Sequence, residues 1–198
     1  HTPIRRQRQM CIRDSPWDKA DLSKKISSDV KDIINKDKKG SFSYNISNTD
    51  RSVGANVSGE IASRYGEDGL SGSLNLNFMG SAGQSFGCWN ANGLNITLNG
   101  DANDYVGKGM NGGKIIIKND SDFAINNNKT ILAGNTCLYG ATGGEIYISG
   151  SVGERFAVRN LGAKAVIEGA GDHCCEYMTG GHVTIPVSYT HLRAHETS

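Results

Sequence analysis

The chain has 198 residues, of which 21 are basic, 20 are acidic and 26 are glycine. This length suffices for one domain with a core of its own. The near balance of charge excludes a strongly basic nucleic-acid-binding protein, and no apolar run approaches the roughly 18 residues that a membrane-spanning helix requires. We therefore expect a cytoplasmic protein with no signal peptide, no membrane partner and no nucleic-acid partner.

Two terminal segments, 1–15 and 187–198, differ in composition from the rest of the chain. They hold arginine but neither lysine nor glycine, whereas the segment between them holds every glycine. Back-translation of "RRQRQMCIRDS" and "VSYTHLRAHET" gives strings that resemble the transposase adapters of sequencing libraries. We expect both segments to be disordered artefacts and exclude them from the fold; the alternative is a basic arm and a histidine-containing tail.

The exclusion changes the charge and the cysteine content. Removing the five arginines, one aspartate and one glutamate of these segments leaves 16 basic and 18 acidic residues, so no basic patch remains to attract phosphate. The remaining cysteines form no C-x-x-C pair, and we expect reduced thiols and no metal. A zinc site is the alternative, although adjacent side chains seldom reach one ion. Its ligands would be His173, Cys174, Cys175 and His182.

The segment 16–47 predicts a helix followed by a strand. Apolar residues recur at helical spacing over Asp18–Lys36, and they alternate with polar residues over Phe42–Ile46. A second short helix is predicted over Ser58–Tyr65, with Ser58 as its N-cap and Gly66 as its stop.

From residue 74 onward a glycine recurs after alternating apolar residues, with a spacing of 16 to 20 residues. A longer gap separates Gly100 from Gly134, where "NDSDFAINNNK" can be looped out. This period is too short for helical-hairpin repeats and predicts a parallel β-solenoid. Alternation along a strand places the apolar residue two before each glycine on one face, which predicts an inward ladder. The ladder consists of Phe78, Leu98, Leu132, Ile148 and Ile167.

The glycines are expected to turn the corners of this solenoid, where a positive φ or a close backbone approach is needed. Gly107–Gly112 also spells G-x-G-x-x-G, but the phosphate interpretation needs a helix after the glycines, and Lys114–Lys118 predicts a strand. The predicted corner glycines are Gly80, Gly100, Gly107, Gly109, Gly112, Gly113, Gly134, Gly143, Gly144, Gly150, Gly169, Gly180 and Gly181.

Several strings of the chain resemble a known family. "NTDRSVGANVSGEIASRYGEDGL", "GDANDYVGKGMNGGKI" and "GERFAVRNLGAKAVIEGAGDHCCEYMTGG" are similar to the C-terminal glycine-repeat (GXGXG) domain of the glutamate synthase large subunit. The resemblance covers about 48–183 and implies an all-β fold, a right-handed single-stranded parallel β-helix over 48–186, preceded by the short helical segment 16–47. It also implies a further glycine-rich turn after residue 185, so we expect the chain to be a fragment.

The family converts glutamine and 2-oxoglutarate to two glutamates in glutamate biosynthesis. The resemblance implies FMN and an iron–sulfur cluster in the parent enzyme, with none of its catalytic, cofactor-binding or metal residues in this fragment. Its implied role is structural, holding the amidotransferase and flavin-binding domains of the same polypeptide, with a small reductase subunit as a further partner. One alternative is a stand-alone glycine-repeat subunit of a glutamate synthase or of a formylmethanofuran dehydrogenase-type complex.

A second hypothesis places a ligand-binding site at two corners, Asp101–Gly113 and Asp172–Glu176. Asp101, Asn103 and Asp104 could act as metal ligands or as an acid–base pair, or stabilise a corner through hydrogen bonds to the backbone. The His173–Glu176 stretch allows acid–base chemistry or an interdomain contact. Arg155 and Arg159 suit an anion or a salt bridge to Glu154 or Asp172, and Trp89 suits a domain contact or the core.

Overall fold

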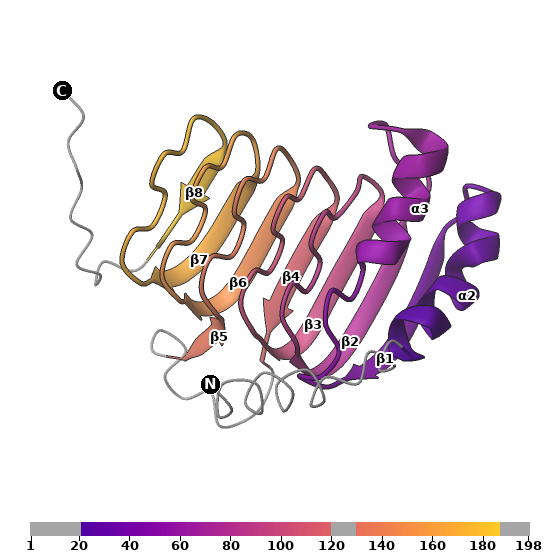
Figure 1. Cartoon of the computed structure of the whole chain (residues 1–198), viewed down its shortest axis with the longest axis horizontal. Helices are drawn as coiled ribbons and strands as arrows, with labels where there is room; N and C mark the ends of the chain where they lie inside the picture. The colour runs from indigo at the N-terminus through magenta and orange to yellow at the C-terminus, as the bar shows by residue number, and fades with distance from the viewer. Residues whose placement is uncertain (1–20, 120–129, 187–198) are drawn as a thin grey trace, which may run out of the picture.

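The computed structural model describes residues 21–119 and 130–186, which form a mostly β fold with two helices (Figure 1). The terminal segments expected to be artefacts, and most of the stretch expected to be looped out, lie outside these residues. The helices are α2 (Asp21–Asn35) and α3 (Ala55–Tyr65). The strands are β1 (Gly40–Ile46), β2 (Leu74–Ala82), β3 (Leu94–Ala102), β4 (Lys114–Lys118), β5 (Ile131–Ala133), β6 (Glu145–Val152), β7 (Lys164–Ala170) and β8 (His182–Thr184).

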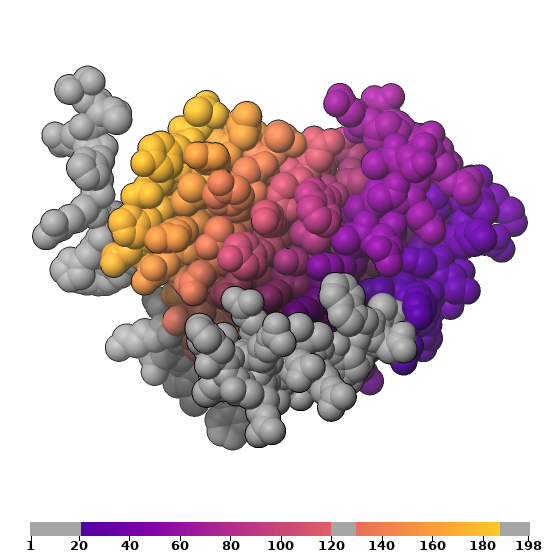
Figure 2. Space-filling model, viewed as in Figure 1, coloured from indigo at the N-terminus to yellow at the C-terminus, as the bar shows by residue number. Residues whose placement is uncertain are grey.

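All of the described strand pairs are parallel. The strand order is β1-β2-β3-β4-β6-β7-β8, and β5 pairs with both β3 and β6. As a result β3, β4, β6 and β5 form a small closed ring of four parallel strands. Figure 2 shows the same sequential order on the surface, where bands of colour follow one another from indigo to yellow. Strands that are consecutive in the sequence therefore lie side by side, except that β4 and β5 do not pair with each other.

The core is built from columns of apolar side chains that cross the strands. One column runs through five residues at paired positions of β2, β3, β4, β6 and β7, and all five are buried. Burying each side chain contributes about 1.5–3 kcal/mol. The column consists of Phe78, Leu98, Ile117, Ile148 and Ile167.

The glycine spacing predicts Leu132 in this column, and this prediction is wrong. Ile117 occupies the position, paired with Leu98 on one side and with Ile148 on the other. Leu132 is buried elsewhere, on the short strand β5. The reason is that the insertion after Lys118 falls inside one repeat, so the apolar strand of that repeat precedes it.

The same insertion changes the place of Gly134 in the repeat. Gly134 directly follows β5, as Gly153 follows β6 and Gly171 follows β7. It therefore opens a loop, whereas Gly100 lies inside β3. An insertion can come before or after the strand of its repeat. The spacing between glycines does not distinguish these two placements, since it is the same in both.

The two helices follow the predicted pattern with one difference. Helix α2 buries Ile26, Val30 and Ile34, which belong to the predicted apolar stripe. Helix α3 ends at Gly66 as predicted, but it begins at Ala55, so Ser58 is not an N-cap. Ser58 is buried inside the helix instead, and Gly54 in the left-handed conformation starts it.

Five loops of equal length join the strands: loop A (83–93), loop B (103–113), loop C (134–144), loop D (153–163) and loop E (171–181). In every one the third, fifth and seventh residues have a positive φ, although most of these residues are not glycine. They are Ser85, Gly87 and Trp89 in loop A, Tyr105, Gly107 and Gly109 in loop B, Thr136, Leu138 and Gly140 in loop C, Arg155, Ala157 and Arg159 in loop D, and His173, Cys175 and Tyr177 in loop E.

These residues connect each loop to its two neighbours through the backbone. In loop B the third residue, Tyr105, donates its N–H to Asn135 O at 2.9 Å, and the seventh, Gly109, donates to Tyr139 O at 2.9 Å. The fifth residue, Gly107, donates in the opposite direction, to Phe86 O at 3.0 Å. The same pattern recurs from loop to loop, so the loops are hydrogen-bonded to one another like the strands. A left-handed non-glycine residue costs about 1–2 kcal/mol, and these bonds offset that cost.

The predicted corner glycines fall into two groups. Seven have a positive φ: Gly80, Gly100, Gly107, Gly109, Gly113, Gly144 and Gly181. The others lie where a Cβ would meet atoms of a neighbouring repeat at 2.0–2.8 Å, and they are Gly112, Gly134, Gly143, Gly150, Gly169 and Gly180. A close approach, rather than φ, excludes larger side chains in the second group.

Two glycines with a similar φ distinguish the effect of backbone strain from the effect of steric overlap. Gly113 (φ 67°) has no room for a Cβ, which would lie 2.1 Å from Leu94 O, whereas around Gly140 (φ 62°) nothing lies within 4 Å. We expect Gly113→Ala to lower the free energy of unfolding by about 3–5 kcal/mol, since strain and overlap add. Gly140→Ala should cost about 1 kcal/mol, from strain alone. Urea unfolding of both variants measures the difference, and equal losses would contradict this account.

Candidate functional site

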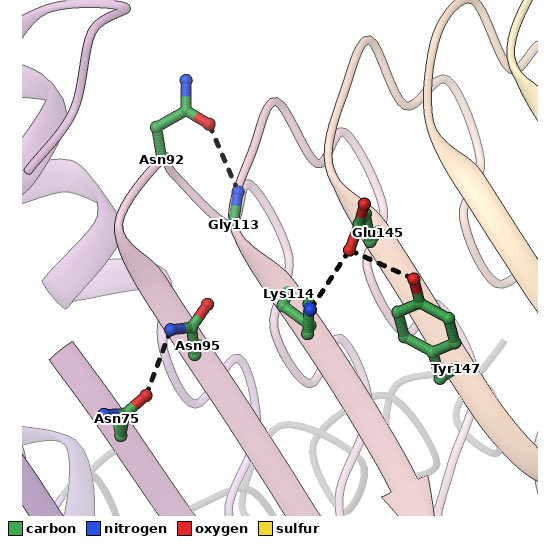
Figure 3. Close-up of polar contacts among 7 residues, drawn as sticks. All are labelled: Asn75, Asn92, Asn95, Gly113, Lys114, Glu145 and Tyr147. Carbon is green, nitrogen blue, oxygen red and sulfur yellow. Dashed lines mark hydrogen bonds and ion pairs between the residues drawn. The ribbon is translucent and has the colours of Figure 1, made fainter. Parts of the chain in front are cut away.

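A shallow hollow of about 320 Å³ lies where the loops join the strands. Its walls come from four successive repeats, with glycines at most of the loop ends. Asn92 closes one end, where its side-chain oxygen accepts the N–H of Gly113 at 3.4 Å (Figure 3). The amide nitrogen of Asn92 donates to Glu67 O at 2.9 Å. The lining residues are Asn92, Gly113, Gly144, Glu145, Gly162 and Lys164.

Glu145 is the acidic group of this hollow, and it is neutralised by neighbours on the same face of the sheet. Lys114 Nζ lies 3.2 Å from Glu145 Oε2, and the Tyr147 hydroxyl donates to the same oxygen at 3.1 Å (Figure 3). The hydrogen bond from Lys114, aided by the one from Tyr147, holds the pKa of Glu145 below its ordinary value. An ionised, paired carboxylate is a poor proton donor or acceptor near neutral pH.

The same face carries a ladder of polar side chains without a nucleophile. Asn75, Asn95, Lys114 and Glu145 lie at paired positions of β2, β3, β4 and β6. Asn95 donates to Asn75 Oδ1 at 3.1 Å (Figure 3). Such cross-strand pairs stabilise a sheet by about 0.2–1 kcal/mol each, so the geometry favours a structural surface over a reacting one. The sequence offered a signal for it, since Lys114 and Glu145 both follow the final glycine of a loop.

The first candidate corner uses its polar side chains within the protein. Asp101 Oδ1 accepts the Ser81 hydroxyl at 2.8 Å, and Asn103 Oδ1 accepts the N–H of Asp104 at 2.7 Å. Asp104 Oδ1 in turn accepts the N–H of Asn135 in the next loop, at 2.7 Å. These are the bonds of Asx residues that stabilise corners, and they link β2 to β3 and loop B to loop C.

The second candidate corner holds an exposed ion pair. His173 Nδ1 lies 2.6 Å from Glu176 Oε1, and both side chains are about half exposed. The hydrogen bond to Glu176 raises the pKa of His173 above its ordinary value, and the charge of Asp172 adds to this effect. Arg155 is connected to Asp172 through the backbone, since its N–H donates to Asp172 O at 2.8 Å. No salt bridge between Arg155 or Arg159 and an acidic side chain occurs in the part of the chain that the structure describes.

The described cysteines are free thiols. Burial raises the pKa of Cys137 to about 12 and also raises that of Cys88, so neither is poised as a nucleophile. Cys174 and Cys175 have their sulfur atoms 3.5 Å apart. The hydrogen bond between these thiols lowers the pKa of Cys175 and raises that of Cys174.

The described residues do not fit the cofactors that the resemblance implies for the parent enzyme. Within 21–119 and 130–186, no three His, Cys, Asp or Glu side chains are grouped as ligands of a metal ion, and an iron–sulfur cluster needs several cysteines. The predicted zinc alternative at His173–Cys175 and His182 therefore finds no support. Gly107–Gly113 leads into β4 instead of a helix, so the phosphate cradle of a nucleotide site is not formed.

The family model described as "GXGXG motif" matches residues 21–190, and the chain belongs to this family. The chain is also similar to ferredoxin-dependent glutamate synthases. It is 54% identical over 157 residues to ferredoxin-dependent glutamate synthase 2 of Synechocystis sp., an alignment that covers 79% of this chain and 10% of the relative. It is 56% identical over 142 residues to ferredoxin-dependent glutamate synthase of Pyropia yezoensis, covering 72% of this chain and 9% of the relative.

A plant relative has a similar identity and a similar coverage. Ferredoxin-dependent glutamate synthase 2, chloroplastic, of Arabidopsis thaliana is 53% identical over 157 residues, which are 79% of this chain and 10% of the relative. The chain thus spans about a tenth of the length of these relatives. Neither α2 nor α3 is long and apolar enough to cross a membrane.

The pKa of His173 provides a test of the second corner. Because Glu176 raises this pKa in the folded chain, the pair stabilises the fold below the ordinary histidine pKa, and this contribution is lost as the pH rises through the folded-state value. We expect Glu176→Gln to shift the NMR titration midpoint of His173 downward. The matched variant Asp172→Asn should shift it less, since Asp172 acts only through its charge. An unchanged midpoint in Glu176→Gln would contradict the contact.

Proposed function

We propose that this chain is the parallel β-helix region of a ferredoxin-dependent glutamate synthase. In this proposal it holds the amidotransferase and flavin-binding domains of the same polypeptide in place and has no chemistry of its own. The observation that carries the proposal is the double series of backbone contacts, in which successive strands pair in register and successive loops exchange N–H···O bonds. Such a stack is stiff, which is what a spacer between catalytic domains requires.

The finer description of the fold is part of this proposal. Consecutive parallel strands, joined by loops of one length, support a single-stranded parallel β-helix over 48–186. Its right-handedness follows the strong preference for right-handed connections between parallel strands. We propose that the two groups of glycines form its corners, and that the column from Phe78 to Ile167 is its inward ladder. The predicted boundary near residue 47 stays a prediction, and the register of β1 with β2 supports one folded unit across it.

The parent enzyme would convert glutamine and 2-oxoglutarate to two glutamates. FMN and the iron–sulfur cluster would be held by its other domains, because the donors found here do not suit them. The names of the relatives favour ferredoxin as the electron donor, so we propose ferredoxin in place of the small reductase subunit that the resemblance implied. The cytoplasmic location stays a prediction, since the plant relative is named as chloroplastic.

The two alternatives have less support. A stand-alone glycine-repeat subunit would be expected to match short relatives, and the relatives described above are about ten times longer than the matched region. A ligand-binding corner at Asp101–Gly113 would need polar groups directed at a ligand. The side-chain oxygens of Asp101, Asn103 and Asp104 instead accept hydrogen bonds from the protein.

The scaffold proposal predicts the effect of removing this region from a complete enzyme. In the Synechocystis relative, replacing the matched residues with a flexible Gly/Ser linker should leave glutamine hydrolysis in place but release ammonia before it is reduced. We expect the glutamate formed per glutamine consumed to fall from two towards one, measured by amino-acid analysis under ferredoxin-driven turnover. A chimera carrying this chain in the same place is the control and should keep the ratio. An unchanged ratio with the linker, or stoichiometric FMN bound to this chain, would contradict the proposal.

A further inference from the structure

Two adjacent cysteines of loop E have their thiols in contact. Cys174 Sγ lies 3.5 Å from Cys175 Sγ, and one thiol donates a hydrogen bond to the other. Both side chains are partly exposed, whereas Cys88 and Cys137 are buried. The proposed scaffold function makes no use of this pair, so its chemistry is a separate question.

The backbone of the loops explains how neighbouring side chains come to lie on one side. Successive side chains of an extended strand point to opposite faces, but the fourth and fifth residues of loops A, B, C and D are all buried. Cys174 and Cys175 are the fourth and fifth residues of loop E, and both pack against the core. The equivalent residues are Phe86 and Gly87, Val106 and Gly107, Cys137 and Leu138, and Phe156 and Ala157.

Contacts of the main chain hold the second cysteine in place. The φ of Cys175 is 62°, and its N–H donates to Phe156 O in loop D at 2.8 Å. Its carbonyl accepts the N–H of Met178 at 3.2 Å. The two sulfur atoms are therefore kept close together by the same left-handed backbone that connects the loops.

The environment of the pair favours oxidation at one of its two sulfur atoms. The thiolate is the reactive form of cysteine, and the hydrogen bond from Cys174 lowers the pKa of Cys175. A partly exposed thiol that forms its thiolate easily and has a second thiol beside it is typical of redox-sensitive cysteines. Cys137 is the opposite case, since its burial raises its pKa to about 12.

Two other uses of a thiol pair have less support. Among the residues that the structure describes, no third ligand completes a metal site with these thiols. A nucleophilic cysteine of the catalytic kind needs a neighbouring base. The ring of His173 instead contacts Glu176, with Nδ1 2.6 Å from Oε1.

We propose that Cys174 and Cys175 form a modification site at which a hydroperoxide oxidises the two thiols to one disulfide. The inference does not depend on the proposed scaffold function. The Cα atoms of adjacent residues lie about 3.8 Å apart, which is closer than the roughly 4.4–6.8 Å usual for a disulfide. Such a disulfide is strained and easily reduced by a dithiol, so the modification is reversible.

The oxidation takes place in two steps, shown here for hydrogen peroxide. The Cys175 thiolate attacks one peroxide oxygen, so that an S–O bond forms, the O–O bond breaks, and the leaving hydroxide takes up a proton to become water. The Cys174 thiol then loses its proton and attacks the sulfenic acid on Cys175. An S–S bond forms, the S–O bond breaks, and hydroxide leaves with that proton as a second water molecule. The two thiols supply the two electrons that reduce the peroxide.

The test uses the full chain with Cys11→Ser, which removes the one thiol outside the described residues. The chain is treated with hydrogen peroxide, remaining thiols are alkylated, and peptides are analysed by mass spectrometry. We expect the Cys174–Cys175 peptide to form an internal disulfide at least about tenfold faster than Cys88 and Cys137 are oxidised in the same sample. Dithiothreitol should restore both thiols.

Two variants test the role of each thiol, and each introduces a residue that another loop has at the equivalent position. Cys174→Val repeats Val106 of loop B, and it should leave a sulfenic acid on Cys175 that dimedone traps, because the second thiol is absent. Cys175→Ala repeats Ala157 of loop D, and it should slow the oxidation of Cys174 at least about tenfold. Circular dichroism checks that both variants fold.

Three results would overturn the inference. The first is oxidation of the pair at the rate of Cys88 and Cys137, which needs no variant. The second is a disulfide between two chains in place of the internal one, seen on a non-reducing gel. The third is a folded Cys174→Val chain in which peroxide leaves no sulfenic acid on Cys175.

Discussion

The structure depends on one backbone arrangement, in which left-handed residues at three alternate positions of loops B, C and D send their N–H groups to the neighbouring loops. Tyr105, Gly107 and Gly109 show it in loop B, where the outer two donate forward and the middle one donates backward. The loops are therefore as regular as the strands that they join. Because each bond needs the neighbouring loop at a fixed distance, loop length and strand register are constrained together, and the insertion near residue 120 is accommodated in the strand region instead.

The same regularity explains why polar side chains of the loops and the sheet contact groups of the fold itself. Asp104 and Asn103 cap loop amides, and Asn90, fully buried, donates to Leu94 O and Gly112 O at 2.9 and 3.0 Å. Glu145 is paired with Lys114. Side chains that satisfy backbone groups or one another are not available to a substrate, since a catalytic group must have an unused lone pair or proton within reach of it. These contacts are consistent with the proposed scaffold role.

Membership of the GXGXG family and similarity to enzymes about ten times longer give this stack of strands and loops a context. A stack of this kind can grow by one repeat at a time without disturbing the repeats already in place. Its inner column contributes stability, its sheet carries polar ladders, and its loops are free to differ at the exposed positions. Trp89 and Gly109 show how one repeat can change its surface while the backbone pattern stays the same.

The sequence by itself determined the family through the resemblance of its strings, and its periodic apolar residues determined the first helix and the strand that follows it, because they report burial directly. It also placed Phe78, Leu98, Ile148 and Ile167 at equivalent positions of successive repeats. It did not determine that Ile117 replaces Leu132, since an insertion within a repeat preserves the glycine spacing. Nor did it reveal the left-handed residues, because Trp89, Leu138 and Arg155 are not of the types that favour this conformation. Only the tertiary structure decides such positions, since hydrogen bonds between loops distant in sequence stabilise a backbone that no local preference would select.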